Sequence, residues 1–243
     1  MSGHSKWATT KRAKAVTDAK RSNLFTKLAR GITVAAREKG GDPEANFGLR
    51  LAIEKARAAN MPKENIERSI KRGTGEIKGE AAIEELLYEG FGPGGTTIII
   101  KCLSDNKNRT ASDIKHLLNA HGGSLGGPNT VMWQYELKGV IRINQDELTG
   151  KNQEELELQI IDFGAQDITQ EDNGMIIYTR IEDLQKILNK LKEINLNPED
   201  AQIEYVAKEK ISLSPDLEQK NQNLFEALDE NEDVDDYYTN IKE

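Results

Sequence analysis

Apolar residues between positions 22 and 40 recur at the spacing of an α-helix. At about 100° per residue they fall on one side, which is the pattern of a helix with a single packed face. Gly40 follows the last of them, and glycine is typical of the position just after a helix. The pattern predicts a helix over 22–39 whose packed face contains Leu24, Phe25, Leu28, Ile32 and Ala36.

Two shorter helices are predicted next. The tripeptide Asp-Pro-Glu at 42–44 offers an N-cap, a proline at the first helical position and an acid in the first turn. A helix should therefore run from there to about Ala59. A third helix should follow Pro62 and end before Gly73. The three helices predict a small bundle, with the glycine-rich stretch 73–80 as its exit linker.

After the linker the apolar residues alternate, which is the period of a β-strand. Strands are predicted over 83–89 and 96–103, joined as a hairpin by Gly-Pro-Gly-Gly at 92–95. Cys102 shares a strand face with Ile98 and Ile100, which predicts a core thiol. The remaining elements predicted for this region are a helix over 110–120, a strand over 131–137, a helix over 215–228 and a strand over 234–240.

The segment from 139 to 206 has the pattern strand, helix, strand, strand, helix, strand, with an Asn-Gly turn between its middle strands. This βαββαβ order is that of the ferredoxin-like fold. We therefore expect an α+β protein of three domains, an N-terminal helical bundle followed by two ferredoxin-like α/β sandwiches. The expected boundaries are 1–80 for the basic helical domain, 81–137 plus 207–243 for a discontinuous α/β domain, and 138–206 for the domain inserted into it.

Charge is divided unevenly along the chain. Residues 1–80 carry 18 Lys/Arg and 9 Asp/Glu, a net +9, whereas the rest carries 15 and 32, a net −17. The total of −8 is thus the sum of a basic module and an acidic remainder. Exposed Lys and Arg on a compact module attract polyanions wherever the rest of the chain points. Composition therefore indicates a nucleic-acid partner and leaves open which nucleic acid it is.

The basic residues of the helix over 22–39 lie opposite its apolar side. Lys27, Arg30 and Arg37 fall within roughly 80° of one another at the helical period. Residues 1–39 contain ten Lys/Arg and only two acids. A solvated polar face usually mixes both signs of charge, so this face is interpreted as a binding surface, with a merely solvated face as the alternative.

Arg109 is expected near the start of the helix over 110–120, where the helix dipole prefers anions. That mismatch indicates a phosphate or an acidic partner for its side chain.

The segment 229–236 places six acids in eight positions. Such runs are usually solvated, and this one could also compete within the molecule for the basic module.

The sequence offers no arrangement that predicts catalysis. The glycines at 92–95 lack the Lys and hydroxyl that a phosphate loop places after its last glycine. His116 and His121 are five apart, whereas paired metal ligands on a helix are four apart. We expect no catalytic residue, no metal, no cofactor and no small-molecule substrate. A single cysteine and the lack of a long apolar run favour a cytoplasmic protein without a membrane partner.

Several stretches of the chain resemble the YebC family of bacterial regulatory proteins, whose mitochondrial members are translational activators of cytochrome oxidase. The resemblance extends over nearly the whole length. It is carried by GHSKW at 3–7, DAKRSNLFTKL at 18–28, GGDPEANFGLRLAIEKARAANMP at 40–62, YEGFGPGGT at 88–96, CLSDNKNRT at 102–110 and LFEALDENEDVDDYYTN at 224–240.

The resemblance implies three domains and a non-enzymatic function in gene expression. Family members are described as DNA-binding transcriptional regulators and also as translation factors that act on ribosomes stalled at sequences such as proline runs. We expect DNA as the partner, with ribosomal RNA, tRNA or the ribosome as the alternative. Trp7 is either a base-stacking residue or an anchor of the bundle. The residues expected to bind nucleic acid are Lys6, Trp7, Lys11, Arg12, Lys14, Lys20, Arg21, Lys27, Arg30, Arg37 and Arg109.

Overall fold

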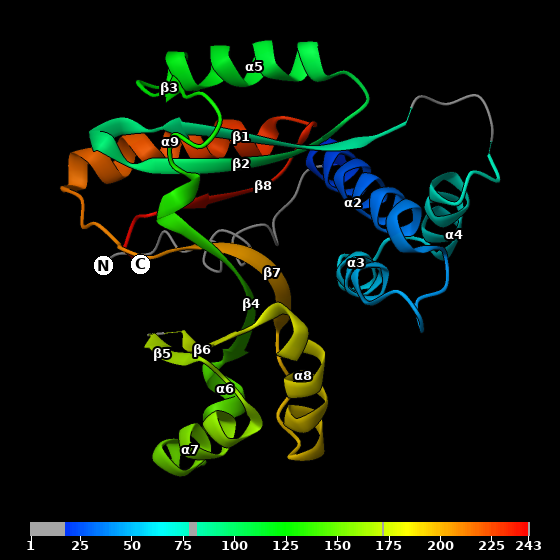
Figure 1. Cartoon of the computed structure of the whole chain (residues 1–243), viewed down its shortest axis with the longest axis vertical. Helices are drawn as coiled ribbons and strands as arrows, with labels where there is room; N and C mark the ends of the chain where they lie inside the picture. The colour runs from blue at the N-terminus through cyan, green and yellow to red at the C-terminus, as the bar shows by residue number, and fades with distance from the viewer. Residues whose placement is uncertain (1–17, 78–81, 172, 243) are drawn as a thin grey trace. The chain divides into compact units, whose positions relative to one another are not determined.

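The computed structural model describes residues 18–77, 82–171 and 173–242, and their side chains from Arg21 onward. The chain forms two compact units (Figure 1). Unit 1 comprises Met1–Gln134 with Ala207–Glu243, and unit 2 comprises Tyr135–Val206. Helices at the N-terminal end precede two four-stranded sheets, one in each unit. The predicted α+β class is confirmed, and unit 2 lies within the sequence of unit 1.

The helical part of unit 1 consists of α2 (Asp18–Lys39), α3 (Phe47–Ala58) and α4 (Lys63–Gly73), which lie together in Figure 1. Their apolar faces meet in one cluster, which confirms the predicted bundle. The fully or nearly buried members of that cluster include Leu28, Ile32, Leu49, Ile53 and Ile66. Gly40 follows α2 with φ +91°, the left-handed conformation expected of a residue that ends a helix.

The start of α3 differs from the prediction. Asn46, and not Asp42, is its N-cap, and the Asn46 Oδ1 accepts a hydrogen bond from the Leu49 N–H at 3.1 Å. The Asn46 amide also donates to the carbonyl oxygens of Ala35 and Gly40, at 2.8 Å each. Asp42 instead accepts from the Glu44 N–H within a turn. Asn46 is the N-cap because its buried side chain both caps α3 and binds the carbonyl groups at the end of α2.

Unit 1 also contains a sheet in the order β3-β1-β2-β8. Strands β1 (Glu84–Phe91) and β2 (Thr97–Ser104) form the predicted hairpin, and the outer strands are β3 (Ser124–Leu125) and β8 (Val234–Thr239). Helices α5 (Lys107–Ala120) and α9 (Pro215–Glu230) pack on one face, against Ile98, Ile100 and Cys102. Cys102 is 0% exposed, so the predicted core thiol is confirmed.

The glycine-rich turn of the hairpin packs tightly on α9. Asn221 is buried, donates to the Pro93 carbonyl oxygen at 3.0 Å and accepts from the Thr96 hydroxyl at 3.0 Å. An added Cβ at Gly92 would lie 2.8 Å from the Asn221 Oδ1, and Gly94 has φ +77°. Close packing and positive φ therefore explain these glycines.

The strand predicted over 131–137 is only partly correct. Residues Met132–Gln134 form a short 3-10 helix, and a single strand, β4 (Tyr135–Asn144), runs through the two strands predicted around Gly139. Residues 131–133 are apolar, which favours a strand. The N–H groups of Val131 and Met132 instead donate to the carboxylate of Glu89, which is distant in the sequence, and the chain turns there.

Unit 2 has the predicted βαββαβ order. Its sheet order is β5-β6-β4-β7, which places β6 between the strands that α7 connects, as in a split βαβ arrangement. Helices α7 and α8 supply Ile160, Ile187 and Leu191 to its buried residues. Its other elements after β4 are α6 (Gln145–Leu148), α7 (Gln153–Phe163), β5 (Asp167–Glu171), β6 (Gly174–Thr179), α8 (Leu184–Glu193) and β7 (Asp200–Ala207).

Candidate nucleic-acid interface

Helix α2 is packed on two opposite sides. One side contributes Leu28, Ile32 and Ala36 to the bundle core. The other side contacts the sheet and the connection between α9 and β8. On that second side Val34 is 5% exposed and packs with Ile83 and Leu103. The face predicted to be a basic binding surface is therefore largely a contact surface inside unit 1.

The basic side chains of that face bind main-chain carbonyl groups at the end of α9 and just beyond it. Lys27 Nζ donates to the Asp229 carbonyl oxygen at 2.7 Å. Arg30 Nη1 donates to the Glu232 carbonyl oxygen at 2.7 Å, and Asn23 Nδ2 donates to that of Glu230 at 3.0 Å. The last carbonyls of a helix lack intrahelical partners and carry partial negative charge. Lys27 and Asn23 of α2 satisfy two of them here, and Arg30 binds a carbonyl just beyond the helix.

Asp233, just before β8, is the centre of a polar cluster that joins α2, the end of β2 and the first turn of α5. Its carboxylate accepts hydrogen bonds from Arg30 at 2.7 Å, Thr110 Oγ1 at 2.8 Å, Ser104 Oγ at 3.1 Å and Arg109 Nη2 at 3.1 Å. The Asp233 side chain is 9% exposed. We call Asp233 with these four donors the Asp233 cluster. It fixes the helical bundle to the first sheet.

The pKa values within this contact follow from its geometry. Burial alone would raise the pKa of Asp233, but hydrogen bonds from Thr110, Arg109 and Ser104 and the charge of Arg30 lower it below its ordinary value. Burial lowers the pKa of Lys27, and the nearby charge of Asp229 opposes this effect only in part. Asp233 therefore stays ionised at neutral pH and keeps its guanidinium partners.

Arg109 has an acidic partner within its own chain. Helix α5 begins at Lys107 after the N-cap Asn106, whose Oδ1 accepts from the Arg109 N–H at 3.1 Å. The Arg109 guanidinium pairs with Asp233 and with Asp105, each at 3.1 Å. A cation near this helix N-terminus is thus compensated by two carboxylates. Of the two partners predicted for Arg109, the acidic one is present.

The prediction that Lys27, Arg30 and Arg37 share one solvent face is wrong for the first two. The Arg30 side chain is only 19% exposed, and Lys27 is partly buried. Gly31 and Val34 lie on the same side of α2, and a glycine and an apolar residue among basic residues could have signalled a packed face. An added Cβ on Gly31 would lie 4.0 Å from the Leu103 Cδ1.

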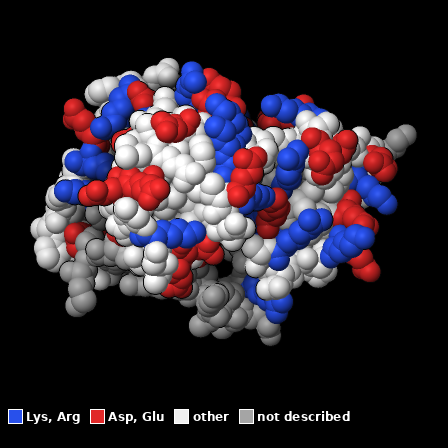
Figure 2. Space-filling view, turned by 90° about the horizontal axis from the view of Figure 1, so that it is seen from below, with Lys and Arg blue, Asp and Glu red and all other residues white. Residues whose placement is uncertain are grey.

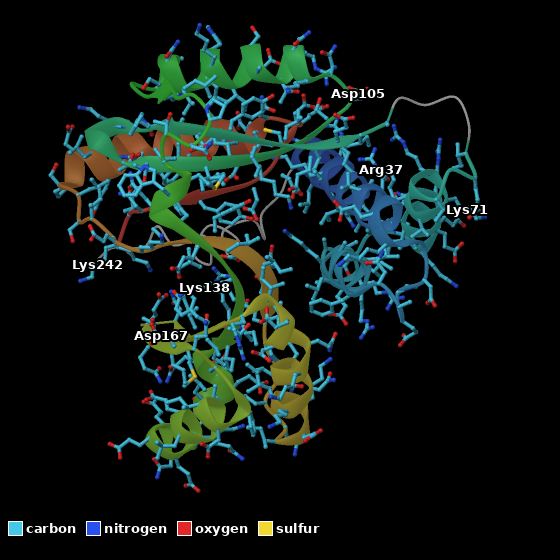
Figure 3. The ribbon with its side chains drawn as sticks, in the orientation of Figure 1. Arg37, Lys71, Asp105, Lys138, Asp167 and Lys242 are labelled. Carbon is cyan, nitrogen blue, oxygen red and sulfur yellow. The ribbon has the colours of Figure 1, made fainter. Side chains whose placement is uncertain are left out.

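Arg37 remains exposed, and a second exposed cation lies on the neighbouring helix. Figure 3 shows Arg37 on α2 and Lys71 on α4. The two helices cross closely at Gly73, where an added Cβ would clash with the Thr33 carbonyl oxygen and lie 3.2 Å from the Arg37 nitrogen. No ion pair is recorded for Arg37 or Lys71 among the described residues. The exposed basic residues of the bundle include Arg21, Arg37, Lys39, Arg57, Arg68 and Lys71.

The remaining predicted binding residues lie in the first 21 positions of the chain. Lys6, Trp7, Lys11, Arg12 and Lys14 lie outside the described residues, as does the side chain of Lys20. Arg21 is exposed, and its guanidinium lies 5.5 Å from the centre of the Phe25 ring. Residues 21–77 carry 12 Lys/Arg and 7 Asp/Glu, so the described part of the bundle is basic by five charges.

Charges of both signs are mixed on the surface of the protein (Figure 2). On the face shown in Figure 2, basic and acidic side chains alternate in small groups and do not form one continuous basic area.

An open depression of about 300 Å³ lies over the Asp233 cluster and contains more acids than arginines. It therefore suits a polyanion poorly. Its lining residues are Arg30, Asp105, Arg109, Asp113, Asn231, Glu232 and Asp233.

Neither a metal site nor a membrane-crossing element is found in the described part of the chain. Within those residues, no group of three or more His, Cys, Asp or Glu side chains is placed to hold a metal ion. None of the described helices is both long and apolar enough to cross a membrane.

The fold and the basic bundle define a class, an α+β protein with a helical N-terminal part and one four-stranded sheet in each of two compact units. Family comparisons agree with that class. Residues 5–76 match the TACO1/YebC protein N-terminal domain, and residues 83–241 match the TACO1/YebC second and third domain. The chain belongs to the TACO1/YebC family, which confirms the resemblance found in the sequence.

Individual relatives are similar over the full length. A protein of Thermoanaerobacter pseudethanolicus named as a probable transcriptional regulatory protein is 45% identical over 100% of this chain and 97% of its own. One of Thermotoga maritima with the same description is 46% identical over 100% and 94%. A crystal structure of a conserved hypothetical protein from Aquifex aeolicus has a TM-score of 0.83 at 40% identity, covering 94% of this chain and 93% of that one.

Proposed function

We propose that this protein is a non-enzymatic, cytoplasmic regulator of gene expression that binds DNA through the exposed cations of its helical bundle. The relatives named as transcriptional regulatory proteins support the regulatory function. The observation that carries the binding proposal is the exposed pair Arg37 and Lys71, which lie on crossing helices without a recorded ion pair among the described residues. Exposed cations on one rigid bundle suit contacts with the phosphate backbone of a nucleic acid.

The packing of α2 limits how such an interface recognises its partner. Direct base readout requires a helix whose outer face is free to enter a groove. The outer face of α2 is occupied by the sheet and by the end of α9. Binding through the bundle is therefore expected to use phosphate contacts, which position the nucleic acid without reading its sequence.

A translation factor acting on the ribosome is the second candidate. It is favoured by the exposed Trp133, because recognition of single-stranded RNA uses bases stacked on aromatic side chains. The nucleic acid that crosslinks to the protein in cells distinguishes the two candidates. Promoter DNA supports the first, and ribosomal RNA or tRNA supports the second.

The binding proposal is tested by reversing charge at the exposed pair. The double variant Arg37→Glu/Lys71→Glu is compared with Lys186→Glu/Lys192→Glu, which makes the same charge change on α8 of unit 2. For duplex DNA, loss of two phosphate contacts should reduce the slope of log K against log salt by about 1.8. The control pair should keep the wild-type slope. Wild-type affinity and slope in the Arg37/Lys71 variant would overturn the proposal.

A further inference from the structure

Trp133 is the most exposed large apolar residue recorded in the described chain, at 67%. It lies in the short 3-10 helix Met132–Gln134 of unit 1, just before β4. Its indole Nε1 donates to the Thr130 carbonyl oxygen at 3.1 Å. That hydrogen bond fixes the orientation of the ring while most of its surface stays in solvent. Trp133 therefore presents a large apolar ring to solvent in a fixed orientation.

The loop that carries Trp133 is held by a buried carboxylate. Glu89 is 7% exposed, and its carboxylate accepts from the N–H groups of Asn129 at 2.6 Å, Val131 at 2.8 Å and Met132 at 2.7 Å. Hydrogen bonds to an ionised acceptor are stronger than neutral ones. Three of them converge on the residues immediately before Trp133, so the ring is presented by a rigid loop.

Lysines accompany the tryptophan. Lys208 Nζ donates to the Trp133 carbonyl oxygen at 2.9 Å, and the Lys208 N–H donates to that of Gln134 at 2.9 Å. Lys210 precedes Ile211 in the same segment, and the Lys242 N–H donates to the Ile211 carbonyl oxygen at 2.7 Å, so Lys242 lies next to Ile211 at a short parallel bridge. All three lysines are exposed, and Figure 3 labels Lys242. The segment 207–211 contains one acid, Glu209.

This combination fits single-stranded nucleic acid better than a protein surface. Most residues from Gly126 to Thr130 are glycine or polar, so the tryptophan is not part of a wide apolar patch of the kind that protein partners cover. Single-strand binders combine aromatic platforms, on which bases stack, with cations that follow the backbone. A base in a duplex is already stacked on its neighbours and offers no free face to the ring.

We propose that Trp133, with Lys208, Lys210 and Lys242, binds single-stranded nucleic acid, with an unpaired base stacked on the indole and phosphates near the lysines. The proposal rests on the proposed function, in that it assumes a nucleic-acid partner. It adds a second contact surface on unit 1, separate from Arg37 and Lys71, and it specifies an unpaired strand as the ligand there.

Tryptophan fluorescence tests the stacking directly. The chain has two tryptophans, so a Trp7→Phe variant leaves Trp133 as the reporter. Titration with a single-stranded adenylate 12-mer should quench its emission to saturation, whereas a blunt duplex of the same length should not. In the chain with Trp7 retained, Trp133→Ala should weaken binding of the single strand roughly 5- to 150-fold, the range for loss of one stacked base. Trp133→Phe should restore most of the affinity.

Two further variants distinguish base stacking at Trp133 from a general effect of losing an exposed apolar side chain and from binding by charge alone. Leu87→Ala removes another exposed apolar residue of unit 1 and should leave binding unchanged. Lys210→Gln/Lys242→Gln should reduce the salt slope by about 1.4 on a single strand. Unchanged single-strand affinity in Trp133→Ala would overturn the stacking proposal. So would quenching by a proline-rich peptide but not by the oligonucleotide, which would indicate a protein-docking surface.

The failure of this proposal can be told apart from that of the proposed function. If Arg37→Glu/Lys71→Glu weakens nucleic-acid binding while Trp133→Ala does not, the bundle interface stands and the Trp133 site is overturned. If the wild-type protein binds neither duplex nor single strand, both proposals are overturned together.

Discussion

Replacing Asp233 with alanine is expected to separate the helical bundle from the first sheet. The substitution removes the acceptor shared by Arg30, Ser104, Arg109 and Thr110. It leaves a mostly buried guanidinium at Arg30 and a buried hydroxyl at Thr110 without this carboxylate. Arg109 is 47% exposed, so water can replace its partner at little cost.

The expected loss of unfolding free energy is about 3–5 kcal/mol, the range for removing one partner of a buried ion pair. Contributions of the single hydrogen bonds do not add, because all four donors share one carboxylate. Asp233→Asn keeps the shape and one carbonyl acceptor, so its loss should be smaller. Asp113→Ala on the exposed side of α5 makes the same charge change and should cost no more than about 0.5 kcal/mol.

The stabilisation by Asp233 should also depend on pH. Its pKa in the folded protein is lowered, so its contribution is present above the pKa of the unfolded chain, near 3.9, and is lost as the pH falls through the folded value. The stability difference between wild type and Asp233→Asn should therefore be constant near neutral pH and shrink below about pH 4.

Urea unfolding followed by circular dichroism measures these free energies. A loss of less than about 1 kcal/mol in Asp233→Ala at pH 7 would show that the cluster contributes no more than a surface ion pair and does not hold the bundle to the sheet. A difference between wild type and Asp233→Asn that grows as the pH falls would refute the sign of the pKa argument.

Three further variants or measurements probe other parts of the fold. Gly73→Ala should cost about 1–3 kcal/mol in urea unfolding, because a methyl group there clashes with the Thr33 carbonyl oxygen; an unchanged midpoint would contradict the close helix crossing. Glu204→Ala should cost about 3–5 kcal/mol by leaving Arg142 without its bidentate partner, at 2.7 and 2.9 Å. Burial raises the pKa of Cys102 to about 12, so a thiol reagent at pH 8 should label it only after unfolding. Fast labelling of the native protein would contradict its buried position.

Helices and strands with a strong apolar period were predictable from the sequence. The stripes of α2 and α8 and the alternation of β1 and β2 depend on local spacing, which the sequence contains directly. The start of α3 and the turn at Met132–Gln134 were missed for another reason. Asn46 and Glu89 determine them through hydrogen bonds to residues up to 43 positions away, and local spacing does not reveal such contacts.

The position of the basic residues along α2 was predictable, and the groups that they contact were not. Helical periodicity places Lys27 and Arg30 on one face of α2. Their partners, Asp229 and Asp233, are more than 200 residues away in the sequence. The sequence alone leaves the acidic segment 229–236 either solvated or in competition for the basic module. The structure supports the second alternative, since this segment binds two of the cations expected to bind phosphate.

In the proposed function, nucleic acid binds to the exposed cations of the bundle and not to those held against the end of α9. Ultraviolet crosslinking in cells, followed by mass spectrometry of the peptides that carry a nucleotide, tests it most directly. Nucleotide adducts are expected on peptides around Arg37 and Lys71. Adducts confined to unit 2, or to the segment 229–236, would contradict it.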